Sequence, residues 1–329
     1  MATTQVTPTM APADKPARPL MVENHSMHWM ECVPNVSEGQ RPSVIAGCAD
    51  AIRGGGSALL DVTSDVSHHR SVYTFAGHPQ ALHASVTALF ASALATIDLR
   101  THHGQHPRLG VVDVVPFVPL GEATMADAVA LARHVGADVA DRFGLPVYLY
   151  EDAAVRPGRR RLEAIRRGGF EGLVSKMSHP EWTPDFGPSK PHPTGGASVI
   201  GARPFLIAFN VNLRTNRLDV AKHVARTVRE SSGGLPAVKA LGLMLADRDT
   251  AQVSMNLSDF RQTSITAAFD AVRTSAATYG VDVLESELIG LAPEAALSAA
   301  IAAHVHLSDF TEDRILEVRL AAQARHASR

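Results

Sequence analysis

The chain has 329 residues, of which 45% are hydrophobic and 19% charged, and its formal net charge is −2. These values are typical of a globular enzyme with one large or two modest domains, and they exclude a whole-chain electrostatic attraction to nucleic acid. We find no apolar run of the roughly eighteen residues that a membrane-spanning helix needs, so we expect no membrane association. Cys32 and Cys48 lie outside any CxxC pair, which predicts reduced thiols and a cytoplasmic protein.

The first half of the chain alternates predicted strands and helices after an amino-terminal extension. Residues 1–28 are rich in Thr, Pro, Ala and Met without the apolar region of a signal peptide, so we expect disorder there. A polar turn is expected at 63–70. We predict strands at 30–36, 58–62, 71–75, 111–118 and 146–150, and helices at 42–53, 79–97 and 124–143.

The middle and second half follow a similar alternation. Five arginines between positions 159 and 167 predict a solvated helix face, and residues 175–196 read as a linker or a functional loop. Each half fits a β-α-β-β-α-β order, which predicts two α/β lobes with mixed sheets, at 29–200 and 201–329, and a ligand cleft between them. We predict strands at 204–212, 238–246, 251–256 and 281–289, and helices at 219–231, 265–279, 293–306 and 311–322.

The loop from His102 to Gly110 has the sequence HHGQHPRLG and leads into a predicted buried strand. Imidazoles exchange protons near neutral pH, and Pro107 favours an extended backbone at His106 that lets its side chain project. Arg108 offers a cation for a carboxylate. Three alternatives stay open for this loop: proton transfer, a metal site without accompanying acidic or cysteine ligands, and an incidental polar loop.

Two further stretches are candidates for chemistry. In DVTSDVSHHRSV, Asp61 and Asp65 could stabilise a cation and Arg70 could bind a carboxylate, or Asp65 could simply cap a turn. In GPSKPHPTGG, residues 187–196, prolines limit the freedom of the loop and glycines allow a planar ligand to approach the backbone. The alternative for this loop is a rigid linker.

Seven stretches of the chain, in order, resemble the formiminotransferase family in its stand-alone form, without a cyclodeaminase part. They span about residue 29 to residue 320. The stretches are ECVPNVSEG (31–39), RSVYTFAG (70–77), HHGQHPRLGVVDVVPFVP (102–119), LPVYLYEDAA (145–154), PDFGPS (184–189), GARPFLIAFNVNL (201–213) and AQVSMNL (251–257).

This resemblance implies a fold, an activity and a set of site residues. The fold is a pair of ferredoxin-like α/β subdomains with a ligand tunnel between them, usually in a homodimer. The activity moves a formimino group from N-formimino-L-glutamate to N-5 of tetrahydrofolate, the co-substrate, in histidine degradation, and no metal is expected.

The resemblance makes His106 the catalytic histidine. The carboxylate of Asp61 or Asp65 would stabilise the cationic formimino group. Arg70, Arg108 and Arg203 are candidate partners of substrate carboxylates. The remaining pocket candidates are Asn35, Gln105, His102, Asn210 and Asn212, and the expected folate loop is Gly187, Pro188, Ser189, Lys190, Pro191, His192, Pro193, Thr194, Gly195 and Gly196.

Three positions differ from the family's usual pattern. Gln105 replaces an acid before the catalytic histidine, His69 replaces an Asn, and Thr63 stands where an Asp is expected. Two alternatives therefore stay beside the implied reaction. One is transfer of a formyl or formimino group from a different donor to folate, and the other is a non-catalytic folate-binding protein.

Overall fold

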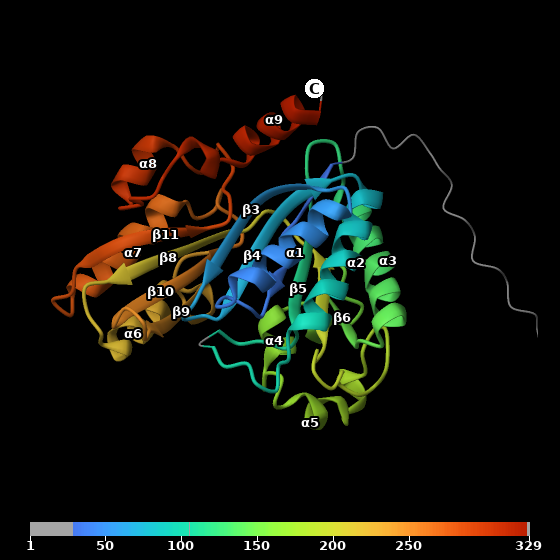
Figure 1. The fold of residues 1–329 in the computed structure, drawn as a ribbon. Helices are drawn as coiled ribbons and strands as arrows, with labels where there is room; N and C mark the ends of the chain where they lie inside the picture. The colour runs from blue at the N-terminus through green and yellow to red at the C-terminus, as the bar shows by residue number, and fades with distance from the viewer. Residues whose placement is uncertain (1–28, 105, 328–329) are drawn as a thin grey trace, which may run out of the picture.

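The computed structural model describes residues 29–104 and 106–327 (Figure 1). The expectations for residues 1–28 and for Gln105 lie outside this range. Within it, the strands form a seven-stranded mixed sheet and a four-stranded antiparallel sheet. The predicted α/β class with two lobes is confirmed, although the second sheet is antiparallel rather than mixed. No helix in this part of the chain has the length and apolar character to cross a bilayer.

The first sheet is built on a β-α-β-β-α-β unit with the strand order β3-β4-β1/β2-β5, which is the ferredoxin-like order. Strands β7 and β6 extend it in parallel beyond β5. The elements are β1 (Met30–Cys32), β2 (Asn35–Val36), α1 (Pro42–Gly54), β3 (Ala58–Asp65), β4 (Arg70–Gly77), α2 (Pro79–Thr96), β5 (Val112–Pro119), α3 (Met125–Phe143), β6 (Val147–Glu151) and β7 (Ser198–Ala202).

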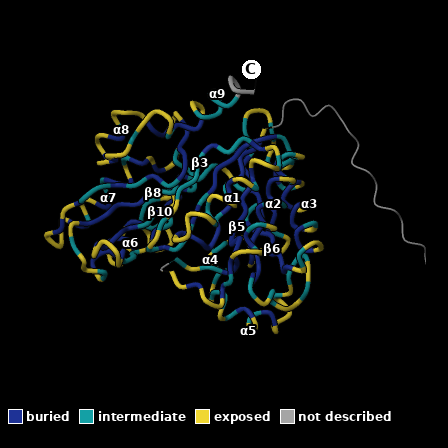
Figure 2. The backbone as a smooth tube through the Cα atoms, viewed as in Figure 1, coloured by how far each residue is buried: buried dark blue, intermediate teal, exposed yellow. Residues whose placement is uncertain are grey.

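Helices α1, α2 and α3 cover one face of this sheet and bury an aliphatic core against it (Figures 1 and 2). Local signals set the bounds of α3. Thr124 and Asp127 form a capping box at its start, and Gly144 adopts a left-handed φ of 60° at its end. These three helices cover only one face of the sheet, and the opposite face is covered by other elements.

The segment between β6 and β7 packs on that opposite face. It contains the 3-10 turns η1 (Pro157–Arg159) and η2 (Pro180–Trp182) and the helices α4 (Leu162–Arg166) and α5 (Leu173–Met177). Ile165 and Leu173 bury against the sheet residues Tyr148 and Val199. This packing holds α4 beneath the sheet rather than in solvent.

The expectation of a solvated arginine face is wrong for two of its members. The side chain of Arg159 is only 2% exposed, and it donates to Asp185 and to backbone oxygens of Glu181 and Thr183. Arg166 is 13% exposed and pairs with Asp113. The remaining three arginines, which flank α4 in the sequence, are exposed as expected.

The second lobe repeats the β-α-β-β-α-β order with strands arranged β11-β8-β10-β9. Alternate residues such as Phe209 and Val253 face α6 and α7, whereas Asn210 and Gln252 lie on the other face. The elements are β8 (Ile207–Leu213), α6 (Leu218–Val228), η3 (Glu230–Ser232), β9 (Val238–Leu245), β10 (Thr250–Leu257), α7 (Ile265–Ala277), β11 (Val283–Ile289), α8 (Ala299–His304), η4 (Glu312–Arg314) and α9 (Leu316–Ala327).

The carboxyl-terminal elements return to the first lobe. Leu316 at the start of α9 packs with Leu60 of β3 and with Leu291. Helix α8 is shorter than the expected 293–306, because the Ser298 side chain accepts from Ile301 N and so sets the start of the helix. These contacts fix the two lobes against each other beside β3.

Candidate functional site

The histidine loop lies against the turn between β3 and β4. Strand β3 continues to Asp65, so the expected polar turn of 63–70 is reduced to residues 66–69. His102 Nε2 contacts the His69 carbonyl oxygen at 2.9 Å, and the centres of these two rings are 4.1 Å apart. A Cβ on Gly104 would lie 2.5 Å from His68 O, so only glycine permits this approach.

His106 lies beside a buried arginine supplied by the start of β4. Nη1 of Arg70 lies 2.7 Å from His106 Nδ1, and Nε of the same guanidinium donates to Asn35 Oδ1 at 2.7 Å. Asn35 stands opposite Val72 and Val114 in the sheet, so its side chain lies on the face that the amino-terminal helices leave open. The structure thus brings together three of the site residues expected from separate motifs.

A buried carboxylate and a second arginine complete this cluster. Asp113, 1% exposed on β5, accepts from Leu109 N at 2.7 Å through Oδ1. Its Oδ2 atom contacts Arg70 Nη1 at 3.3 Å and Arg166 Nη2 at 2.5 Å. The sequence reasoning missed both Asp113 and Arg166. A lone acid inside the apolar run VVDVVPFV was the available signal for Asp113.

The charges around His106 favour a neutral imidazole. Burial lowers the pKa of His106 well below its ordinary value, and Arg70 and Arg166 lower it further by repelling the protonated ring. The ring of His68 meets that of His106 edge-on, with centres 6.0 Å apart. His106 is therefore available as a proton acceptor at neutral pH.

The two contacts of His106 Nδ1 require opposite tautomers. Arg70 only donates, so Nδ1 must accept there, whereas Pro107 O, 2.9 Å away, only accepts and requires a proton on Nδ1. When Nδ1 carries the proton, Nε2 has the free lone pair. A hydrogen bond from Arg70 to Nδ1 leaves the proton on Nε2, whereas loss of that bond lets Nδ1 carry the proton and leaves Nε2 as the base.

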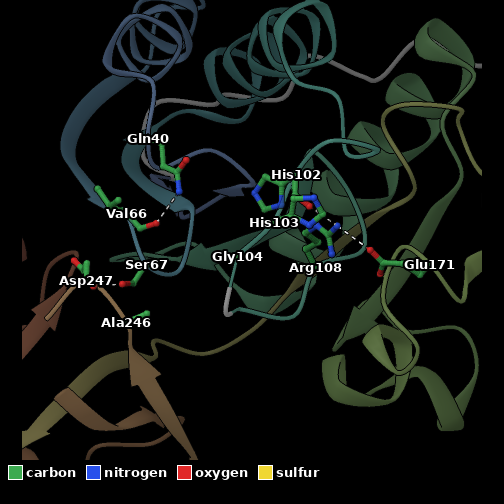
Figure 3. Close-up of a pocket in the computed structure, with 10 residues that line it drawn as sticks. All are labelled: Gln40, Val66, Ser67, His102, His103, Gly104, Arg108, Glu171, Ala246 and Asp247. Atoms are coloured by element: carbon green, nitrogen blue, oxygen red, sulfur yellow. Dashed lines mark hydrogen bonds and ion pairs between the residues drawn. The ribbon is translucent and has the colours of Figure 1, made fainter. Parts of the chain in front are cut away.

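An open cavity of about 460 Å³ lies next to the histidine loop and between the lobes (Figure 3). Ser67 donates to Asp247 of the β9–β10 turn at one side of this cavity. The guanidinium of Arg108 donates to Glu171 and to His102 O, both at 2.9 Å, on the other side. The lining residues are Gln40, Val66, Ser67, His102, His103, Gly104, Arg108, Glu171, Ala246 and Asp247.

Asp61 and Asp65 lie on the β3 face that carries the contact with the second lobe. Asp65 accepts from His68 N at 2.6 Å and thereby caps the turn. Asp61 accepts from Thr63 Oγ1 at 2.7 Å, and this hydroxyl in turn accepts from Gly290 N at 3.3 Å. Both carboxylates thus hold local structure around the turn and the lobe contact.

The loop 187–196 lies beside residues 109–111, which connect the histidine loop to β5. Thr194 O accepts from Leu99 N at 3.0 Å, and Ala197 N donates to Leu109 O at 3.2 Å. His192 and Gly196 exchange backbone hydrogen bonds, which closes the loop into a tight turn. Its residues do not line the open cavity of Figure 3.

The backbone of Arg203 lies away from the histidine loop. Its N–H donates to Phe117 O near the end of β5, whereas the histidine loop precedes the start of that strand. These positions are separated along the strand by roughly 15 Å. Burial raises the pKa of the neighbouring Glu31 to about 7, and the positive charge of Arg203 opposes this rise.

Asn212, another expected pocket residue, belongs to a polar network on the second sheet. Asn212 Oδ1 accepts from Gln252 Nε2 at 2.9 Å, and its Nδ2 donates to Glu287 at 2.8 Å. Arg248 closes the network by pairing with Glu287 and Glu285. Asn210 stands opposite Glu287 on the same face. The other members were not predicted from the sequence: Gln252 lies on β10, Glu285 and Glu287 lie on β11, and Arg248 lies in the β9–β10 turn.

No group of three or more His, Cys, Asp or Glu side chains suited to a metal ion occurs among residues 29–104 and 106–327. The described cluster offers proton transfer at His106 and anion binding at guanidinium groups.

Comparisons with known proteins match both lobes. Residues 29–203 match the formiminotransferase domain, N-terminal subdomain, and residues 208–323 match the formiminotransferase domain. A glutamate formimidoyltransferase from Streptococcus pyogenes serotype M1 is 43% identical over 293 residues, covering 88% of this chain and 98% of the relative. A glutamate formimidoyltransferase from Thermoplasma acidophilum is 44% identical over 302 residues, covering 91% and 99%. A formimidoyltransferase-cyclodeaminase from Rattus norvegicus is 41% identical over 280 residues, covering 83% of this chain and 52% of the relative.

Proposed function

The chain belongs to the formiminotransferase family, and on this premise we propose that it transfers the formimino group of N-formimino-L-glutamate to N-5 of tetrahydrofolate. The products are 5-formiminotetrahydrofolate and L-glutamate, and the reaction belongs to histidine degradation. The observation that carries the proposal is the position of His106, whose Nδ1 lies 2.7 Å from Arg70 Nη1 and 2.9 Å from Pro107 O. This reaction needs one group that accepts and then returns a proton, and burial lowers the pKa of His106 so that it can accept one.

The proton transfers follow from the two nitrogens of His106. N-5 of the folate attacks the formimino carbon, and His106 Nε2 accepts the proton that N-5 loses, while Nδ1–H donates to Pro107 O. The tetrahedral intermediate then breaks its bond to the glutamate nitrogen, which takes the proton from Nε2. Because Arg70 and Arg166 disfavour the protonated ring, His106 returns the proton readily.

The remaining site assignments are part of the same proposal. Asp61 or Asp65 stabilises the cationic formimino group, Arg70 and Arg108 attract substrate carboxylates, and loop 187–196 binds the folate. The support for Arg70 is its contact with His106, and the support for Arg108 is its place in the cavity wall. Arg203 has the weakest support, because it lies at the far end of β5.

We also propose a cytoplasmic homodimer with a domain boundary near residue 200. The separate apolar cores of the two lobes support this boundary, since residues 203–206 connect them. The free and buried thiols of Cys32 and Cys48 support a reducing compartment.

Turnover with both substrates tests the proposed reaction. Purified protein is mixed with N-formimino-L-glutamate and tetrahydrofolate, and the formimino-folate product is followed by absorbance and mass spectrometry. We expect product with the wild-type chain and a loss of at least a hundredfold in His106→Ala, given the usual contribution of general acid–base catalysis, about 10²–10⁴-fold. Folate binding without turnover contradicts the proposal, and turnover only with N-formyl-L-glutamate indicates a different donor.

A further inference from the structure

We propose that Arg166 binds the α-carboxylate of the formimino donor and so selects a donor that carries this group beside the reacting nitrogen. This inference rests on the proposed function and deepens it by assigning one recognition contact. The sequence suggested a solvated role for Arg166, whereas the structure places it in the cluster around His106.

Arg166 lies between the lobes and close to the catalytic histidine. Arg166 ends α4, and that helix lies between the lobes, because Lys239 of β9 reaches Glu163 of α4 at 3.0 Å. Arg166 Nη2 and Arg70 Nη1 contact the same oxygen of Asp113, and Arg70 is also 2.7 Å from His106. The guanidinium of Arg166 is therefore linked to the catalytic ring through a single shared carboxylate and a single arginine.

Arg70 and Arg166 differ in the hydrogen-bonding capacity that their present contacts leave. Arg70 already donates to Asn35 and Asp113, and its Nη1 atom also contacts His106 Nδ1. By contrast, Nε of Arg166 is buried and has no hydrogen-bond partner among the residues that the structure describes. A buried guanidinium N–H without an acceptor is costly, and a bidentate carboxylate is the group that best matches the donor geometry of arginine. Arg166 is thus better placed than Arg70 to receive a new anion.

The two arginines and Asp113 together carry a net positive charge. Asp113 supplies a single negative charge to two guanidinium groups, each only 13% exposed at the side chain. The cluster retains an excess positive charge that a bound carboxylate would compensate. On the donor, the α-carboxylate is adjacent to the nitrogen that receives the proton from His106. The carboxylates of folate are attached at the end of its tail remote from N-5, so they are poorer candidates for this place.

A comparison of donors and variants tests the assignment. Steady-state kinetics are measured for N-formimino-L-glutamate and for N-formimino-4-aminobutyrate, which lacks the α-carboxylate, with wild type and Arg166→Gln. We expect Arg166→Gln to lower kcat/KM about 10- to 100-fold for the glutamate donor, as for loss of a charged hydrogen bond. With the aminobutyrate donor the same substitution should lower kcat/KM by a clearly smaller factor, because the partner carboxylate is already absent and only the effect of Arg166 on Asp113 and His106 is lost.

The matched control is Arg167→Gln, which removes the same charge from the next and exposed position. We expect its kinetics to stay within about twofold of wild type. A readout without turnover is the rise in melting temperature caused by the product L-glutamate, which should be reduced in Arg166→Gln and retained in Arg167→Gln. The KM for tetrahydrofolate should stay unchanged in both variants.

Two results overturn the inference: equal losses with both donors, or no loss in Arg166→Gln. Either result leaves the proposed function standing as long as wild type converts formiminoglutamate, so the two failures are distinguishable. Arg166→Lys provides a second test, because it keeps the charge next to Asp113 and loses the planar fork. It should show a smaller loss with the same dependence on the donor, and a loss independent of the donor contradicts the assignment.

Discussion

Asp113→Asn removes the negative charge that holds two buried arginines beside His106. The amide oxygen can still accept from Leu109 N, so that hydrogen bond is retained. Arg70 and Arg166 lose their negatively charged partner, and the amide NH₂ that replaces Oδ2 is a donor that cannot pair with either guanidinium. Hydrogen bonds to charged groups contribute about 1.5–3 kcal/mol each, so their combined loss is about 3–6 kcal/mol.

The energy cost of breaking a buried ion pair is of similar magnitude. Removal of one partner of a buried ion pair typically costs about 3–5 kcal/mol, because the remaining charge stays buried without compensation. Asp113 is 1% exposed, so solvent screening does not reduce this cost greatly. For a chain of this size the loss corresponds to a drop in melting temperature on the order of 10 °C.

The assay is thermal and urea unfolding of wild type, Asp113→Asn, Arg166→Met and the double variant. Because the protein has two lobes, each transition is analysed separately. The double variant should be less destabilised than the sum of the single variants, with a coupling energy of about 0.5–3 kcal/mol, since it removes a cation together with the anion. A loss below about 1 kcal/mol for Asp113→Asn, or strict additivity, would refute the claim that these charges are coupled in a buried cluster.

Three further predictions concern the same region. The plot of kcat/KM against pH should be flat from pH 8 to about pH 6.5 and fall only at lower pH, because the lowered pKa keeps His106 in its base form. A fall in kcat/KM with an apparent pKa above 6.5 in steady-state assays contradicts this. Gly39→Ala should lower the melting temperature strongly, since its Cβ would lie 2.1 Å from Asp65 O, whereas the control Gly54→Ala, with open space around its Cβ, should be neutral or stabilising by up to about 1 kcal/mol. Glu171→Gln should change the free energy of unfolding by less than about 1 kcal/mol in urea titrations, because this partner of Arg108 is 67% exposed.

Much of the fold could be predicted from hydrophobic periodicity. The β-α-β-β-α-β order of the second lobe and the capped helix α3 follow directly from apolar spacing and from Thr124 and Gly144. The extension of β3 to Asp65 could not be predicted, because polar residues in this strand contact the other lobe instead of solvent. The antiparallel pairing of the second sheet depends on strand partners that periodicity does not specify.

The site was predictable where a residue sits in a distinctive local motif. Asn35, Arg70 and His106 come from separate motifs, and their side chains meet in the structure. Arg166 stands in a stretch of arginines with no feature that separates it from exposed Arg167. Only the packing of α4 beneath the sheet decides which of these side chains is buried, and that is a property of the tertiary structure.

The buried charges around His106 fit a group that must carry a proton only briefly. A histidine next to a carboxylate alone would hold its proton more strongly, since an opposite charge raises the pKa of the ring. Here Asp113 pairs with both Arg70 and Arg166, so the two positive charges outweigh its effect on the pKa of His106. A substrate carboxylate at Arg166 would offset one of these cations and raise the basicity of His106 when the donor is bound. The same contact would therefore both orient the donor and prepare the ring to accept a proton from the attacking nitrogen.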